Sequence, residues 1–312
     1  MAILTGLVRR VASRAAGGPV IDDRQRAALT RVLGDPTFEL IPLKNVRDQA
    51  AALPAGSTVS ITASPAKGID ATVELAIDLE SAGLRAIPHL SARMVRDRAH
   101  LRELVGRLRD AGIDRAFVVG GDAKEPGEFL DGLSLLRAMA GLDLLPSEVG
   151  VPCYPQGHPD IPEEALLLAL AEKAPLASYM TTQLCFDPRA IQTFLGARRA
   201  EGIKLPVKIG VPGVAEIPKL LSISARIGVR DASRFVTKNL RFVGALMRSG
   251  GVYRPSSLLD DLAPLIADPA SRVLGLHVYT FNNVASTVSW RREYQAGLGR
   301  RVVPQWTDPE PT

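Results

Sequence analysis

The sequence has few of the residues that mark secreted, metal-binding or nucleic-acid-binding proteins. Of its 312 residues only two are cysteines, Cys153 and Cys185, and they lack CxxC spacing. Two such thiols provide neither a disulfide framework nor a structural zinc site, so we expect no metal and a reducing, cytoplasmic setting. Aromatic residues make up 5% of the chain, which leaves few platforms for stacking on bases.

Long apolar runs and the common nucleotide fingerprints are also missing. No stretch approaches the roughly 20 apolar residues of a membrane-spanning helix, so no membrane association is expected. GxGxxG, GxxxxGK[ST] and GxSxG do not occur. The net charge is +5, but residues 1–33 carry six arginines against Asp22 and Asp23, and the rest is nearly neutral. We therefore expect a small-molecule substrate and no nucleic acid, with no prediction of the oligomeric state.

Beyond residue 33, short β-branched runs alternate with longer periodic segments, which is typical of βα units around a parallel sheet. The pattern predicts eight strands, at residues 37–41, 58–62, 84–90, 115–119, 148–154, 179–184, 206–211 and 273–279. It predicts amphipathic helices between them, for example at residues 71–82, 96–111, 128–140, 163–174 and 188–202.

Eight strands in a chain of this length predict an α/β fold, a single-domain (β/α)8 TIM barrel. We expect the barrel at residues 34–312, with a helical insertion near residues 228–268. Residues 1–33 would form an N-terminal extension that is partly helical or flexible. A doubly wound open sheet is the alternative, but a dinucleotide-binding half lacks its glycine fingerprint.

In such a barrel the active site lies at the carboxyl ends of the strands, and several predicted strands end in polar residues. Glu39 lies inside the apolar run TFELIP. Burial there favours a protonated carboxyl group, so Glu39 is a candidate general acid. The alternative is an ion pair inside the barrel, with Lys44 or Lys208.

Asp122 follows two glycines, and its charge is suited to holding a cationic intermediate; a turn cap is the alternative. Gln183 offers both an acceptor and donors to a planar heterocycle, unless it bonds only to the backbone. His89 and His158 stand alone, without metal-ligand spacing, so no metal is assigned. Both cysteines lie in apolar surroundings, where thiols are inert.

Taken in order, these strand ends resemble the methylenetetrahydrofolate reductase family. The matching segments are FELIP (38–42), VSIT (59–62), AIPHLSAR (86–93), GIDRAFVVGGD (112–122), VGVPCYPQGHPD (149–160), TTQLCFD (181–187) and LHVYTFNN (276–283).

The resemblance implies a barrel enzyme that reduces 5,10-methylenetetrahydrofolate to 5-methyltetrahydrofolate with a reduced nicotinamide. It implies that Glu39 is the general acid, that Asp122 stabilises the N5-iminium cation, and that Gln183 contacts the pterin. Tyr279 and Asn282 would also contact the substrate, whereas Thr62, His89, Tyr154 and His158 would line the cofactor pocket.

The sequence departs from the family where flavin adenine dinucleotide (FAD) normally binds. Gly120 replaces the arginine of an RGD motif, and ASPAKG (63–68) replaces a glycine-rich loop. On the helix after GHP, the flavin-binding polar residues correspond to Ala165, Leu168 and Glu172, with Lys173 one residue out of step. We therefore predict that FAD is absent or weakly bound and that NADH or NADPH donates hydride directly. Asn283 and Ile217 also depart from the family pattern near the folate.

Other functions remain open. The alternatives are a folate-dependent methyl transferase, a flavin barrel of the proline-dehydrogenase type, and a non-catalytic folate-binding barrel. The basic residues near the end, Arg291, Arg292, Arg300 and Arg301, form either a solvated face or a dock for a polyglutamyl tail.

Overall fold

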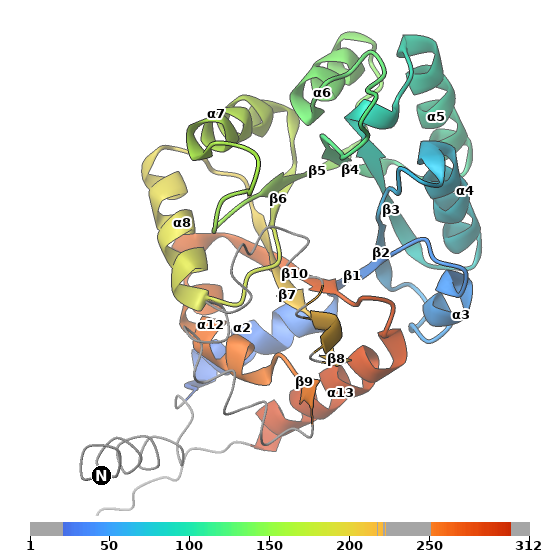
Figure 1. Ribbon diagram of the computed structural model, residues 1–312. Helices are drawn as coiled ribbons and strands as arrows, with labels where there is room; N and C mark the ends of the chain where they lie inside the picture. Colours follow the sequence, from blue (N-terminus) through green and yellow to red (C-terminus); the bar gives the residue numbers. More distant parts are fainter. Residues whose placement is uncertain (1–20, 217, 221, 223–250, 301–312) are drawn as a thin grey trace, which may run out of the picture.

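The computed structural model describes residues 21–216, 218–220, 222 and 251–300, except for the side chain of Arg300. Within these ranges eight parallel strands close into a barrel in the order β1-β10-β7-β6-β5-β4-β3-β2, and helices surround it (Figure 1). The strands are β1 (Thr37–Leu40), β2 (Thr58–Ile61), β3 (Arg85–Ser91), β4 (Arg115–Val119), β5 (Glu148–Cys153), β6 (Tyr179–Thr182), β7 (Val207–Pro212) and β10 (Val273–Tyr279). The predicted (β/α)8 barrel is confirmed, and all eight predicted strands are present with ends shifted by at most two residues.

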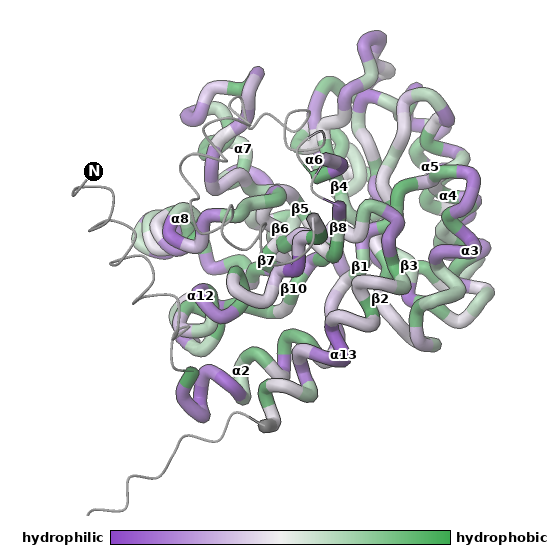
Figure 2. The backbone as a smooth tube through the Cα atoms, turned by 60° about the horizontal axis from the view of Figure 1, so that its bottom comes forward, coloured by the Kyte–Doolittle hydropathy of each residue, from purple (hydrophilic) through white to green (hydrophobic). Residues whose placement is uncertain are grey.

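The helices lie outside the barrel, and hydrophilic and hydrophobic residues alternate along them (Figure 2). They are α2 (Asp23–Gly34), α3 (Val46–Ala50), α4 (Gly68–Ser81), α5 (Arg98–Asp110), α6 (Gly132–Gly141), α7 (Glu163–Lys173), α8 (Pro188–Ala200), α12 (Ser256–Ala267) and α13 (Val284–Arg300). Short 3-10 turns are η1 (Ala92–Met94), η2 (Ala174–Leu176) and η3 (Pro269–Ser271).

Aspartate caps decide where several helices begin. Asp97 and Asp131 each accept a hydrogen bond from the backbone N–H three residues later, at 2.8 Å in both cases. A side-chain acceptor satisfies a free N–H of the first turn and fixes the start of a helix. Helices α5 and α6 therefore begin two and four residues later than the periodicity predicted.

The segments outside the regular βα repeat lie at one side of the barrel. Helix α2 packs against α12 and β10, so the described part of the N-terminal region is part of the fold (Figure 1). The predicted insertion at residues 228–268 lies largely outside the described residues; its described end contains α12 and β9 (Val252–Tyr253). Strand β9 pairs antiparallel with β8 (Ala215–Glu216) in a separate two-stranded sheet. The division at residue 33 stays a prediction.

The barrel interior is aromatic and polar as well as aliphatic. The ring of Phe117 on β4 lies 6.4 Å from that of Tyr179 on β6 and 6.3 Å from that of His277 on β10. Gly150 on β5 makes room for these rings, because a Cβ there would lie 2.4 Å from Tyr179 Cζ and 2.5 Å from Phe117 Cδ2.

Among the described helices, none has the length and apolar character needed to cross a membrane.

Candidate active site

Glu39 and His277 form an acid–imidazole pair inside the barrel. Their strands β1 and β10 are neighbours, and Glu39 Oε2 lies 3.2 Å from His277 Nε2. The two side chains are 14% and 3% exposed, respectively. The backbone oxygen of Glu39 accepts a hydrogen bond of 2.5 Å from Thr280 Oγ1, which fixes the strand end. Glu39 is therefore held in a largely buried place but keeps access to the barrel mouth.

The alternative ion pair of Glu39 with a lysine does not form. Lys208 bonds instead to Glu148 Oε1 at 3.5 Å and lies 4.1 Å from the centre of the Tyr179 ring. Glu148 and Tyr179 begin their strands, so this pair lies at the amino end of the barrel. Burial lowers the pKa of Lys208, and the charge of Glu148 partly restores it. Lys44 is exposed. Glu39 is thus free of a lysine partner among the described residues.

His89 is a neutral neighbour of this pair. Its Nε2 lies 2.7 Å from Ser60 Oγ on β2, and its ring centre lies 4.8 Å from that of Phe117. Burial lowers the pKa of His89 to about 4; the Glu39 charge opposes this effect, and His277 adds to it. At neutral pH His89 is uncharged and acts as a hydrogen-bonding group, while its tautomer depends on the partner.

Two tyrosines stand on the β5 and β10 sides of the mouth. Tyr279 donates its hydroxyl hydrogen to the backbone oxygen of Thr182 at 3.0 Å, and burial followed by the Glu39 charge raises its pKa well above the usual value. Burial, with smaller effects of Cys153 and Asp122, raises the pKa of Tyr154 to about 12. Both phenols therefore stay protonated and can act as hydrogen-bond donors.

Asp122 lies on the loop beyond β4 and is exposed. Gln183 follows β6; its Oε1 accepts from Leu184 N at 2.8 Å, so its amide group NH2 is the part left for a ligand. Thr62 follows β2 and donates its backbone N–H to Leu40 O at 3.0 Å. His158 packs edge-on against Tyr154 at 5.6 Å between ring centres. All four residues lie at the carboxyl ends of the strands, the end at which barrel active sites lie.

Asn282 is engaged differently from the expectation. Its side-chain amide accepts from Ile41 N at 2.9 Å and donates to Ile41 O at 2.8 Å. These two hydrogen bonds tie the end of β1 to the segment after β10. Asn283 similarly donates to Val214 O at 3.0 Å, and Ile217 lies outside the described residues. The substrate contact of Asn282 stays a prediction.

An apolar cluster lines the β6–β7–β10 side of the mouth. Leu184, Leu220, Tyr253 and Phe281 form it with Ala215, and Phe186 and Tyr279 pack against it. Phe281 and Asn282 both have positive φ angles, 51° and 56°. Such angles are uncommon outside glycine and occur at functional loops. The periodicity of the sequence did not reveal this cluster, because its members come from four separate segments.

The residues that the resemblance places at the family's flavin-binding positions fit a flavin pyrophosphate poorly. On α7, Ala165 is exposed and Leu168 is 64% exposed, so neither position offers a hydrogen-bond donor. Glu172 is acidic and pairs with Arg137 at 3.3 Å. Lys173 turns inward, and burial lowers its pKa. In the loop after β2, the N–H groups of Lys67 and Gly68 already bond to Ser64 O. Two adjacent phosphate charges would meet few compensating groups here.

The cysteines are poor nucleophiles. Cys153 and Cys185 are both buried, and burial raises the pKa of each thiol to about 12. A protonated buried thiol is unreactive.

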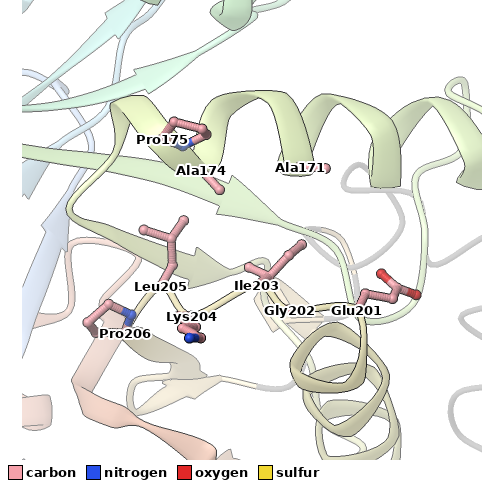
Figure 3. A pocket seen from close by; sticks show the side chains of 9 residues that line it. All are labelled: Ala171, Ala174, Pro175, Glu201, Gly202, Ile203, Lys204, Leu205 and Pro206. Carbon is pink, nitrogen blue, oxygen red and sulfur yellow. The ribbon is translucent and has the colours of Figure 1, made fainter.

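A groove of about 460 Å³ lies away from the predicted site residues. Its lining runs from Ala171 and Pro175 near the end of α7 to Lys204 and Pro206 before β7 (Figure 3). These segments lead into the amino ends of β6 and β7. In barrel enzymes the residues at that end serve stability, and the active site lies at the opposite end.

The fold and the clustered polar groups define a class of protein, a (β/α)8 barrel with an acid group and hydrogen-bonding side chains at the carboxyl ends of its strands. The family model for methylenetetrahydrofolate reductase matches residues 43–289. This match covers most of the chain, so the protein belongs to the methylenetetrahydrofolate reductase family. Membership indicates folate-related reduction; the match begins just after Glu39.

Two of the solved structures that this chain resembles are distant from it in sequence. A chitinase of glycoside hydrolase family 18 (ChiB) from Flavobacterium johnsoniae is 10% identical, with a TM-score of 0.42, over 85% of this chain and 94% of that chain. A candidate phosphonomutase from Burkholderia cenocepacia J2315 is 17% identical, with a TM-score of 0.39, over 72% of this chain and 97% of that one. Similarity at this level says nothing about function.

Proposed function

We propose that this protein reduces 5,10-methylenetetrahydrofolate to 5-methyltetrahydrofolate, with NADH or NADPH as the direct reductant and without a bound flavin. The observation that carries the proposal is the largely buried Glu39 carboxyl group beside His277, in a chain of this family. A largely buried acid that has a hydrogen-bonding imidazole and, among the described residues, no lysine partner is suited to donating a proton.

In the proposed reaction Glu39 donates its proton to N10 as the bond between N10 and the bridging carbon breaks. The electron pair of that bond stays on N10, and the carbon becomes an iminium group on N5. Asp122 stabilises the resulting positive charge. The nicotinamide then transfers a hydride to this carbon, which gives the N5-methyl group and the oxidised nicotinamide. One proton and one hydride are consumed, and Glu39 must be reprotonated before the next turnover.

The remaining side chains have binding roles in the proposal. Gln183 and Tyr279 hold the pterin, and the apolar cluster around Phe281 gives one face of that heterocycle a dry surface. Thr62, His89, Tyr154 and His158 line the opening in which the nicotinamide approaches. Asn282 holds the end of β1 and the segment after β10 together at this opening through its hydrogen bonds to the backbone of Ile41.

Direct reduction is favoured over a flavin relay by the side chains of α7. Exposed Leu168 and the Arg137-paired Glu172 occupy the places where polar groups would meet a flavin. A folate-dependent methyl transferase would use the same acid but would oxidise no nicotinamide.

The test is an anaerobic assay of nicotinamide oxidation driven by methylenetetrahydrofolate, with the purified protein stripped of small molecules and its absorption spectrum recorded. We expect turnover without added flavin and no flavin absorption bands. Stoichiometric flavin in the active protein, or activity that appears only after FAD is added, would refute the direct transfer. The absence of nicotinamide oxidation under both conditions would refute the reductase function itself.

A further inference from the structure

Arg93 holds the loop that carries Asp122 at four points. Arg93 lies in η1, directly after β3, and its backbone N–H donates to Gly120 O at 3.0 Å. Its guanidinium donates from Nε to Ala123 O at 2.7 Å and from Nη2 to Lys124 O at 3.2 Å. Its backbone oxygen accepts from Gly127 N at 3.1 Å. Asp122 therefore lies between two carbonyl groups that a single residue fixes.

Two glycines also allow the loop to lie close to the end of β3 and to the residues that follow it. Gly121 has a φ of +88°, and a Cβ there would lie 1.8 Å from Ser91 Oγ. A Cβ on Gly127 would lie 2.0 Å from Val95 O. Only glycine permits these approaches, so the backbone on both sides of Asp122 follows the surface of β3 and η1 closely.

The guanidinium of Arg93 serves these carbonyl groups and no carboxylate. It is half-buried, and within the described ranges it takes part in no ion pair. Position 120, where the RGD motif would carry an arginine, is glycine here, so the guanidinium that reaches this loop comes from η1, after β3, and not from the residue after β4. A planar guanidinium can bond two carbonyl groups at once, whereas a lysine ammonium is a single point of contact on a flexible stem.

We propose that Arg93 is a positioning residue, which sets the place of the Asp122 carboxylate at the mouth of the barrel. This inference rests on the proposed function, because it assigns to Arg93 the task of aligning the group that stabilises the cationic intermediate. Misplacing a stabilising group by about 1 Å is sufficient to lower a rate by about 100-fold. Arg93 itself touches neither substrate nor reductant.

The test is a double-mutant cycle with Arg93→Met and Asp122→Asn. Arg93→Met is expected to lower kcat/KM for methylenetetrahydrofolate by about 10- to 100-fold in the presence of Asp122. In the Asp122→Asn background the same change is expected to cost less than about twofold, since residues acting as one unit are not additive. Calorimetric binding of 5-methyltetrahydrofolate provides a readout besides turnover.

The matched control is Arg96→Met. Arg96 is exposed three residues further on, its side chain reaches Asp70 at 3.9 Å, and its hydrogen bond to the loop, from Glu128 N, uses its backbone oxygen and not its side chain. Its kinetics should equal those of the wild type. Arg93→Lys keeps the charge but loses the planar guanidinium that bonds two carbonyl groups, so it should give an intermediate kcat/KM. It serves in place of Arg93→Met if circular dichroism shows that Arg93→Met is unfolded.

The outcomes separate the two proposals. If Asp122→Asn is fully active, the assigned role of Asp122 fails. If Asp122→Asn is impaired but the Arg93 substitution is silent, or costs the same with and without Asp122, only the positioning role of Arg93 is overturned.

Discussion

Glu39 and His277 are 238 positions apart in the chain, yet the 3.2 Å contact between Oε2 and Nε2 joins them inside the barrel. The contact exists because β1 and β10, the first and last strands, pair in parallel to close the barrel. Closing the sheet therefore brings the Glu39 carboxyl group, the proposed proton donor, within hydrogen-bond distance of the His277 imidazole. The first two predictions follow from this pair.

Replacing Glu39 by glutamine should remove the proton donor and keep the shape of the side chain. We expect kcat to fall by about 10²- to 10⁴-fold, the usual contribution of a general acid, while the Kd for 5-methyltetrahydrofolate changes little. Steady-state kinetics and calorimetry measure these two effects. Glu148→Gln is the matched control, because this carboxylate also lies in the barrel but pairs with Lys208; it should lower the thermal midpoint and leave kcat unchanged. Wild-type turnover of Glu39→Gln would remove its acid role.

Replacing His277 by asparagine should retain a hydrogen bond to Glu39 but lose an imidazole that can pass on a proton. We expect kcat to fall by about 10²-fold and the dependence of kcat on pH to change shape. The control is His100→Asn, which removes another buried histidine, on α5 outside the barrel, that contacts Asp70 at 3.4 Å and has no contact with Glu39 among the described residues. That variant should lose stability but keep the wild-type pH profile. An unaltered profile in His277→Asn would argue against a proton relay.

The depressed pKa of His89 predicts a loss of stability in acid. The pKa is about 4 in the fold and 6.5 in the reference state, so the unfolded chain binds the proton more readily. His89 therefore leaves the free energy of unfolding undiminished above pH 6.5. As the pH drops toward 4, preferential protonation of the unfolded chain lowers that free energy by about 3 kcal/mol in total. Urea unfolding between pH 7 and pH 4 measures it. His89→Asn should show a shallower loss over this window, and equal slopes for both proteins would contradict the assignment.

The glycine at position 150 should be required for packing of the barrel interior. Gly150→Ala would place a Cβ 2.4 Å from Tyr179 Cζ, so we expect a destabilisation of about 1–3 kcal/mol from overpacking. Gly275→Ala on β10 is the control, since a Cβ there meets nothing within 4 Å. Denaturant midpoints of the two variants should differ clearly; equal midpoints would show that the rings of Tyr179 and Phe117 move aside at little cost.

Much of the fold could be predicted because strand and helix periodicity are local properties of the chain. The strands at residues 115–119 and 273–279 agree with β4 and β10 at both ends. The errors fall where a side chain outside the periodic pattern decides, as at the caps Asp97 and Asp131. The small antiparallel sheet of β8 and β9 was not predicted, since two-residue strands leave no periodic signal.

The sequence by itself determined the βα alternation, the barrel, and the presence of acidic and amide residues at the strand ends, since each depends on residue order along short segments. Only the tertiary structure decided which partners those residues have. It placed His277 beside Glu39, paired Lys208 with Glu148, bound the Asn282 amide to Ile41, and put Arg93 across the Asp122 loop. The physical reason is that these contacts join distant segments through strand pairing and loop packing, and their energies depend on distance in space.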